Sequence, residues 1–587
     1  MSNPNIPQGN PENSKQNYSG NMYSYKNDNN IINDPNEFGT AIRRSIGSGN
    51  PNADFPKNNY EQNYINGGEV PIKQSQSNYN GQNHPFLNWV PYIIFGCVEI
   101  LIIILIGCLF KWDIRNSQLY SLPPHSEVFE PETKRKPIKS EIEEMIADSS
   151  TEELNMNDGL FRDINIMVFA GFGMFHTLLK RYSWTSISLN MMAIAFSFQI
   201  GLFTNLLWAN AFREKWQKGI LNFESFIKSI INSCSILVSL GCILGKLSTT
   251  QYIILIIFET IMSSLNFQLC DVKLKTIDVG GALYIHTFGA IFGIAVYMVL
   301  FCSSKRRAKI FDYNSFNKGN YFSNITSFIG ILFLFSYFPS FNSALALSED
   351  GRYRASINTY LSLSGSIVGS FITSGIYNQG RIVFEHILFG CISGGIIISG
   401  CCSVCIDSWA SLLIGTLSGV ISIVLLQVLK QYFINWHYYD IYNIIIIHGI
   451  HGLLGAFITP MMIGDIKRRL KNKVDYHYIL LKDFDRKNNI QAGVQVGGIF
   501  VTLGLSFVSG IATGYLMKVS TCGNVNHYFT DSEFFENETN IIDNLEQNQF
   551  YYGDINRASL FQIQNQNEFP PFQRASDDRG SQPSYNN

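Results

Sequence analysis

Charged side chains are scarce in this sequence. Asp, Glu, Lys and Arg make up 15% of its 587 residues, while 46% are apolar and 14% aromatic. This composition excludes an ordinary soluble enzyme of this length. The net charge of −2 also argues against the concentrated basic face that binds nucleic acid, so we expect no nucleic-acid partner.

Metal ligands and leader signals are also sparse. The chain has ten histidines and eleven cysteines, and the cysteines lie mostly inside apolar runs, where they behave as small hydrophobes. No disulfide framework is evident. The N-terminus lacks a basic stretch followed by a short apolar run, so the first apolar span is expected to act as an uncleaved signal.

The composition divides the chain into three parts. Residues 1–85 are dominated by Asn, Ser, Gln, Gly, Pro and Tyr, and they cannot bury enough apolar surface to offset the entropy of ordering. We expect a disordered cytoplasmic tail there. Residues 86–520 contain the apolar runs and are predicted to form a transmembrane domain, and residues 521–587 are predicted to be a second, mostly disordered cytoplasmic tail.

The apolar runs predict about twelve membrane crossings, at about 20 residues per crossing. An even number puts both termini on one side, and Lys and Arg in alternate short loops indicate that this side is cytoplasmic. The basic loop at 465–487 contradicts this assignment, although its length weakens the rule. We expect a multi-pass protein of the plasma membrane. The predicted spans are 88–110, 162–180, 184–208, 229–247, 251–270, 279–301, 321–340, 356–377, 383–404, 408–430, 441–462 and 492–517.

Two of these spans repeat one arrangement, in DVGGALYIHTFGAIFG (278–293) and DIYNIIIIHGIHGLLG (440–455). Each has an aspartate, then an apolar run, a histidine eight residues on, and small residues after it. An ionisable group inside hydrocarbon is costly and is usually functional. His286 and His448 are therefore predicted to share one site. Asp278 has two open interpretations, a helix N-cap or a direct role toward the substrate, and the two are compatible.

The same segments resemble the Rh branch of the ammonium transporter (Amt/Rh) family. LFLFSYFPSFNSA (332–344), RASINTYLSL (354–363), MVFAGFGMFHTLLKRYSW (167–184) and GKLSTTQ (245–251) are similar to Rh segments in the same order. The resemblance covers roughly residues 86–525. It implies an all-α integral membrane protein of about 12 transmembrane helices, with the Amt/Rh-type channel fold and pseudo-twofold inverted halves, assembled as a homotrimer in the lipid bilayer.

The resemblance also implies roles for single residues. His286 and His448 match the twin histidines that face each other midway along an apolar pore, and Asp278 matches the aspartate of its outer half. Phe341 matches one of two stacked aromatic gate residues. The other gate position falls at Ile231, so a tight outer gate is in doubt.

Two departures lie around the second histidine. His451 stands where the family usually has proline, and three residues advance an α-helix by about 300°, which would put it on nearly the same face as His448. It then either extends the polar line of the pore or packs. The run Ile444 to Ile447 replaces a Gly and Asn pattern and makes this half of the site more apolar.

The function implied is conduction of ammonia, with methylamine as an analogue and carbon dioxide as a second candidate gas. Proton movement alongside ammonia is left open. The expected protein is not an enzyme and carries no cofactor or metal, since the alternative of a membrane metalloenzyme built on the few intramembrane histidines lacks ligands. A further alternative is a non-conducting ammonium sensor or scaffold that keeps the fold.

Overall fold

A computed structural model describes residues 85–112, 157–214, 216–301, 303, 306–307, 310, 319–346, 348–405, 407–436, 438–469, 486–519, 525, 528–531, 534 and 535. Several expected segments lie outside these residues. They are most of both tails, most of the loop 111–161, the basic loop at 470–485, and the N-glycosylation sequon Asn537-Glu538-Thr539.

The described chain is almost entirely helical, and each of the twelve predicted spans coincides with helical structure, which confirms the predicted fold class. Residues 157–165 are α-helical and continue into the first π-helix. The elements are α3 (Pro85–Leu109), β1 (Phe110–Trp112), η3 (Ile166–Phe172), α5 (Gly173–Phe175), α6 (Ser183–Arg213), β2 (Gly219–Leu221), α7 (Phe223–Ile243), α8 (Thr249–Gln268), η4 (Leu269–Leu274), η5 (Ala282–Thr287), α9 (Phe288–Leu300), α11 (Tyr321–Ser343), α12 (Glu349–Tyr377), α13 (Phe384–Ile398), α14 (Ser408–Asn435), η6 (Ile445–Ile450), α15 (His451–Arg469) and α17 (Asn488–Met517), where η denotes a π-helix.

Length and composition explain why these helices cross a membrane. Within the described residues, nine helices are long and apolar enough to span a bilayer. The α13 helix is apolar but shorter. Several helices begin with a capping box. In it the side chain of the residue before the helix accepts from the backbone amide three residues on, and the side chain of that later residue accepts from the first residue's backbone amide. The pairs are Asn222 with Ser225 in α7, Ser248 with Gln251 in α8, and Asn320 with Ser323 in α11.

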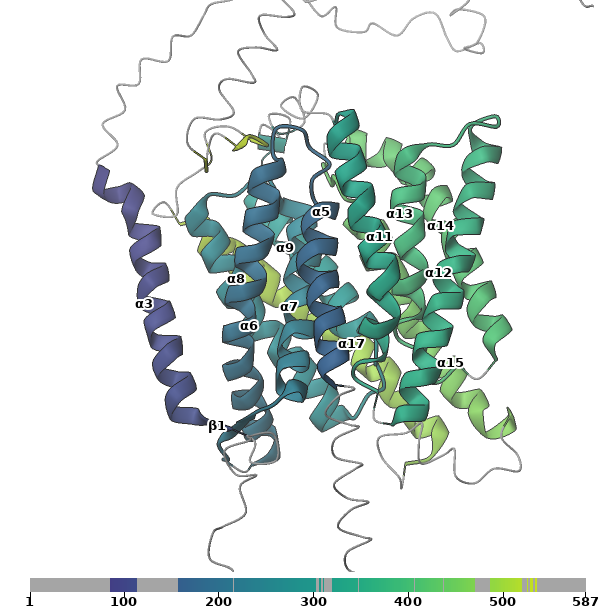
Figure 1. Ribbon diagram of the computed structural model, residues 1–587, viewed down its shortest axis with the longest axis horizontal. Coiled ribbons are helices and arrows are strands. Elements are labelled where there is room, and N and C mark those ends of the chain that lie inside the picture. Colours follow the sequence, from purple (N-terminus) through teal and green to yellow (C-terminus); the bar gives the residue numbers. More distant parts are fainter. Residues whose placement is uncertain are drawn as a thin grey trace, which may run out of the picture. The chain divides into compact units, whose positions relative to one another are not determined.

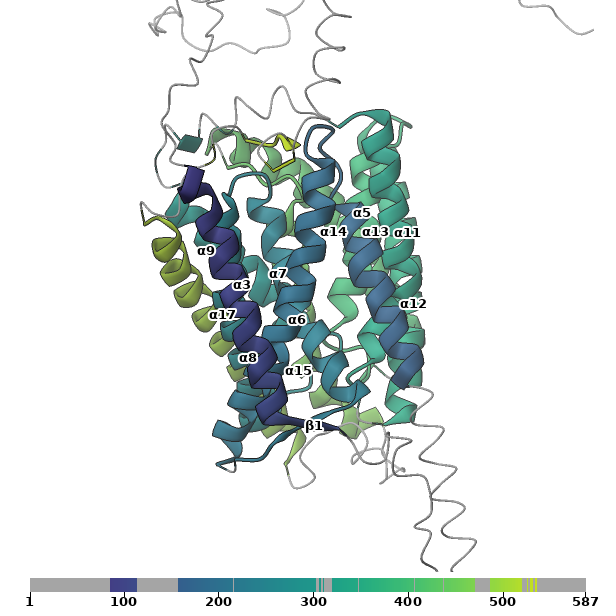
Figure 2. The same cartoon turned by 60° about the vertical axis from the view of Figure 1, so that its left-hand side comes forward.

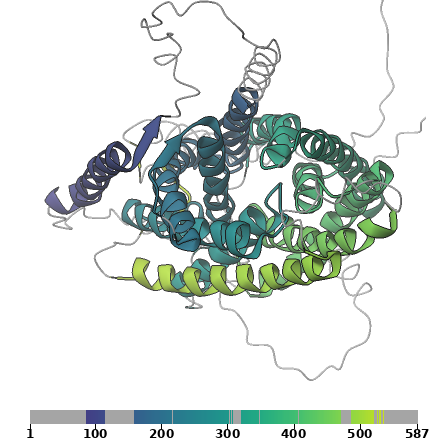
Figure 3. The ribbon, with the colours of Figure 1, turned by 90° about the horizontal axis from the view of Figure 1, so that it is seen from below.

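The helices fall into two groups joined by the last one. The first group contains α6 to α9 and the second α11 to α14, and α17 lies along one side of both (Figures 1 and 3). Its contacts are with α8 and α9 of the first group and with α15. The N-terminal α3 lies at the edge, against α6 and α8 (Figure 2). Its end is tied to the bundle by a short parallel pairing of β1 with β2.

Small residues let the helices approach closely, as expected for membrane helices. The tightest example is the crossing of α12 and α14. A Cβ atom on Gly415 would collide with the carbonyl of Ser362, and one on Gly419 with the carbonyl of Ser366. The glycines of α14 are therefore needed for packing.

A segment beyond α17 packs on the bundle. The Phe529 amide donates to the Gly245 carbonyl (3.0 Å). The Asp531 carboxylate accepts from the amide (2.8 Å) and the hydroxyl (2.6 Å) of Thr185, in the first turn of α6. The ring of Phe534 lies 6.3 Å from those of Tyr182 and Tyr252. These contacts follow residue 520, where the sequence analysis placed the beginning of the C-terminal tail.

Candidate functional site

The centre of the site is a pair of buried imidazoles. His286 lies on η5 and His448 on η6, and each is 2% exposed. Their Nδ1 atoms are 3.1 Å apart, and the ring centroids are separated by 5.2 Å at an interplanar angle of 40°. In a hydrogen bond between two imidazoles one nitrogen donates and the other accepts, so the pair shares one proton along this contact.

An aspartate begins each histidine-bearing turn. The Asp278 carboxylate accepts from the amides of Ala282 (2.7 Å), Leu283 (2.7 Å) and Tyr284 (3.1 Å). Gly281, just before η5, has φ of +81°, a left-handed conformation that favours glycine. The N-cap interpretation of Asp278 therefore describes its contacts, since the carboxylate satisfies amides that the start of a helix leaves unpaired.

Asp440 repeats the arrangement at the second turn. Its carboxylate accepts from the Ile445 amide (3.1 Å). The two turns enter the bundle from opposite ends, because four crossing helices, α11 to α14, lie between α9 and α15 and leave α15 antiparallel to α9. The Asp and His spacing in the sequence thus corresponds to two inverted halves with the same local structure.

The two imidazoles form the start of a line of buried rings, which two phenylalanines continue beyond His286. Phe338 on α11 lies 6.3 Å from the His286 ring, and Phe341 packs edge-on against Phe338 at 6.0 Å and 80°. Ile231 on α7 is 2% exposed and belongs to the same buried apolar cluster as Phe341. Phe338 was not singled out in the sequence, although it stands one helical turn before Phe341.

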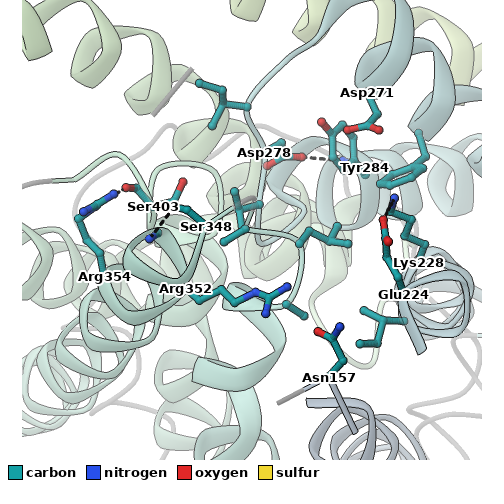
Figure 4. Close-up of a pocket in the computed structure, with 18 residues that line it drawn as sticks. Asn157, Glu224, Lys228, Asp271, Asp278, Tyr284, Ser348, Arg352, Arg354 and Ser403 are labelled. Atoms are coloured by element: carbon teal, nitrogen blue, oxygen red, sulfur yellow. Dashed lines mark hydrogen bonds and ion pairs between the residues drawn. The ribbon is translucent and has the colours of Figure 1, made fainter. Parts of the chain in front are cut away.

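A cavity of about 230 Å³ lies at the Asp278 end of this line. Figure 4 shows Asp278 and Tyr284 on one side of it, and Glu224 with Lys228, which form an ion pair of 2.5 Å, on another. The walls carry acidic and basic groups in similar number, so the cavity is polar without being dominated by one sign of charge. Its polar lining residues are Asn157, Glu224, Lys228, Asp271, Asp278, Tyr284, Ser348, Arg352, Arg354 and Ser403.

Comparison with known proteins identifies the family. The sequence profile of the Ammonium Transporter Family matches residues 146–525, well over half of the chain. The chain is an Rh-type member of this family. Ammonium transporter Rh type C of Xenopus laevis is 29% identical over 464 residues, which cover 77% of this chain and 91% of the relative. Ammonium transporter Rh type B of Oryzias latipes is 29% identical over 435 residues, covering 73% and 87%.

Solved structures agree with the fold. Nitrosomonas europaea Rh50 superposes with a TM-score of 0.56 at 21% identity, covering 70% of this chain and 99% of Rh50. Saccharomyces cerevisiae Mep2 superposes with a TM-score of 0.50 at 15% identity, covering 66% and 91%. The Rh-type chain is thus an integral, multi-pass membrane protein with the Amt/Rh helical fold.

His451, the third histidine singled out in the sequence, is directed toward α14. Nδ1 of His451 donates to the Ile446 carbonyl (2.8 Å), and Nε2 is hydrogen-bonded to the Ser422 hydroxyl of α14 (3.1 Å). The expectation that His451 shares a face with His448 was wrong, because it assumed an α-helix. Residues 445–450 form a π-helix, whose i→i+5 bonding puts more residues in each turn. Three residues therefore turn the chain through a smaller angle.

Two buried histidines of the Rh-type chain, His176 and His386, were missed by the sequence analysis. His176 follows α5 and is fully buried. Its Nδ1 is hydrogen-bonded to the Asn190 side-chain oxygen (3.0 Å), and its Nε2 has no hydrogen-bond partner among the residues that the structure describes. An ionisable residue within the apolar run 167–179 was the available signal.

A buried lysine lies beyond the end of α7 at Ile243, near Asp440, which stands before η6. Lys246 donates to the carbonyls of Cys242 (2.5 Å) and Tyr439 (2.7 Å). Its ammonium lies over the rings of Tyr297 (4.9 Å) and Tyr439 (5.5 Å). Burial lowers the pKa of Lys246 to about 8 and raises that of Asp440 to about 6, and the attraction between the two groups opposes both shifts.

The cysteines of the Rh-type chain include a Cys-x-x-Cys pair, Cys402 and Cys405, that the sequence analysis overlooked. Both are buried. Cys402 donates to the Asn342 carbonyl (3.5 Å) and Cys405 to the Asp407 carbonyl (3.6 Å). Within the described part of the chain, no group of three or more His, Cys, Asp or Glu side chains could hold a metal ion.

Proposed function

We propose that this protein conducts ammonia across a bilayer along a path that passes between His286 and His448. The observation that carries the proposal is the contact between their Nδ1 atoms, which is 3.1 Å long and lies buried where the two apolar helices begin. The contact joins two imidazoles, and within the described part of the chain it leaves Nε2 of His286 without a hydrogen-bond partner. That nitrogen can bind a passing molecule.

Physical chemistry explains why such a path would select ammonia. Ammonium in water resembles potassium in size, so a pore cannot easily separate the two by radius. Removing the water from an ion without supplying replacement ligands is far more costly than removing it from a neutral molecule. An apolar path therefore passes ammonia and rejects potassium, sodium and intact ammonium, and deprotonation becomes the selective step. The imidazoles provide hydrogen bonds that replace those ammonia loses with water.

The relatives support the substrate, because the Rh type C and type B proteins of Xenopus and Oryzias are named ammonium transporters. We assign Phe341, with Phe338 against it, to the gate at the Asp278 end, and Ile231 to the second gate position. Asp278 holds the His286 turn in place and lines the cavity through which substrate would arrive. His451 is left out of the path, because both of its ring nitrogens are occupied.

The wider proposal follows the family. We infer a homotrimer in the plasma membrane with both termini cytoplasmic, methylamine as a transported analogue, carbon dioxide as a lower-ranked second gas, and no enzymatic activity.

Stopped-flow measurement of internal pH in proteoliposomes tests the proposal. After an ammonium gradient is imposed, the wild-type protein should accelerate alkalinisation above empty liposomes. His286→Ala and His448→Ala should change the flux of ammonia or methylamine without preventing trimer assembly. Unchanged flux and selectivity in both variants would remove the proposed role of the histidines.

A non-conducting sensor or scaffold is the second candidate. It is favoured by the buried isoleucine run beside His448 and by isoleucine at the second gate position. Wild-type protein that alkalinises liposomes no faster than empty membranes would favour this candidate. A tail-deleted protein that still conducts would argue against it.

A further inference from the structure

His176 is a buried imidazole that has no role in the conduction path proposed above. It follows α5 at the start of the turn before α6, and none of its surface is exposed. A buried histidine that only packs would normally have both ring nitrogens satisfied. His386 is such a residue in this protein, with Nδ1 3.0 Å from the Ser374 hydroxyl and Nε2 2.9 Å from the Gln427 amide.

The hydrogen-bond network assigns the tautomer of His176. The Asn190 side-chain nitrogen donates to the Ser186 carbonyl (2.8 Å), which turns its side-chain oxygen toward His176. That oxygen can only accept, so Nδ1 of His176 carries the proton and donates across 3.0 Å. In the neutral ring, Nε2 is then an acceptor with a free lone pair. This nitrogen is buried, and none of the described residues bonds to it, so a ligand for it must be a hydrogen-bond donor.

Three aromatic rings surround this imidazole. Its centroid lies 4.6 Å from the ring of Tyr442, 5.4 Å from that of Phe175 and 6.0 Å from that of Phe172. The Tyr442 hydroxyl is occupied, since it donates to the His176 carbonyl (2.5 Å). The surroundings of Nε2 are therefore apolar, and a charged ligand would lose its hydration there without adequate replacement.

The contact with Tyr442 also shows at which end of the helix bundle His176 lies. Tyr442 precedes η6, on the side from which that turn enters the bundle, and it binds the His176 backbone. His176 therefore lies toward the Asp440 end. From the ring of Phe341, the line of ring contacts runs through Phe338 and His286 to His448.

We propose that Nε2 of His176 is a third binding position for a small neutral amine, ammonia or methylamine, beyond His448 on the Asp440 side. The inference rests on the proposed conduction of ammonia and adds a position to it. The amine donates an N–H to the lone pair of Nε2, and this hydrogen bond replaces one lost on leaving the histidine pair. Carbon dioxide has no proton to donate and cannot occupy the position in this way.

Three substitutions at this position test the proposal in proteoliposomes under an ammonium gradient. His176→Phe and His176→Met fill the space with apolar atoms, and methionine adapts to irregular cavities where the phenyl ring does not fit. Both should lower ammonia and methylamine permeability by about 2- to 10-fold, the effect of one net hydrogen bond. His176→Gln keeps a hydrogen-bonding group and should retain more flux than His176→Met.

The matched control is His386→Met, which removes a buried histidine whose nitrogens are both satisfied within the protein. It should lower the unfolding temperature and leave the permeability per folded trimer unchanged. If His176→Met conducts like wild type, or if His176→Gln and His176→Met lose equal flux, the proposal is wrong and His176 only packs. A wild-type protein that does not conduct would instead refute the proposed function itself.

Discussion

Substitution of Asp278 tests whether one carboxylate holds the turn that carries His286. Asp278→Asn preserves the shape of the side chain and replaces one acceptor oxygen by a donor group. With its remaining oxygen at the position of Oδ2, the asparagine can still accept from Leu283 and Tyr284. Its NH2 group then faces the Ala282 amide. Both groups are donors, so the hydrogen bond of 2.7 Å from the Ala282 amide to the Asp278 carboxylate is lost.

The cost follows from the number of bonds. A hydrogen bond to a charged acceptor contributes about 1.5–3 kcal/mol, and an unsatisfied buried donor costs about 1–3 kcal/mol. The two bonds that remain lose their charge assistance and become weaker. The expected destabilisation is about 3–5 kcal/mol, concentrated at the start of η5. The His286 ring should lose its fixed distance to His448, and flux should fall with it.

Unfolding of the purified protein in detergent and liposome flux measure the two consequences. Asp158→Asn is the control, because Asp158 pairs with Arg162 at the protein surface, and such exposed pairs contribute about 1 kcal/mol at most. If Asp278→Asn matches this control in both unfolding temperature and flux, the carboxylate does not organise the turn.

Two further predictions concern Lys246 and Asp531, which lie beyond the ends of the membrane-spanning helices. Between pH 8 and 10.5 the unfolded chain holds the Lys246 proton more tightly than the folded chain does, so stability should rise with pH across this window, by about 3 kcal/mol. Unfolding temperatures measured at pH 7.5 and 10 should show this rise in wild type and lose it in Lys246→Met; parallel curves would contradict it. Asp531→Ala removes the acceptor for the Thr185 amide and hydroxyl, and should speed hydrogen exchange at Thr185 about tenfold. Protection equal to wild type would show that the aromatic rings and the backbone hydrogen bonds hold the segment around Asp531 without its carboxylate.

Local patterns predicted much of the fold and the centre of the site. The helices followed from runs of about 20 apolar residues, which the thickness of a bilayer dictates. The repeated spacing of Asp278 to His286 and of Asp440 to His448 indicated one shared site, and the two imidazoles do meet. The resemblance to Rh proteins supplied the family, which the profile match confirms.

The remaining features depend on geometry that a linear pattern does not contain. The direction of His451 could not be predicted, because an α-helical repeat was assumed where the chain forms a π-helix. His176 was missed because its importance lies in a nitrogen without a partner, which only three-dimensional packing reveals. The contact of Asp531 with Thr185 joins residues 346 positions apart, and nothing in either segment indicates the other.

The opposed entry of the two histidine-bearing turns has a kinetic consequence. On the proposed path, a molecule arriving from either face would meet a π-turn that begins with an aspartate, cross two imidazoles in contact, and leave past a second turn of the same kind. Influx and efflux should therefore encounter barriers of similar height, and half-saturating concentrations measured from the two faces should be similar. The protein would rectify weakly, and what rectification it has should originate on the one side where His176 has no counterpart.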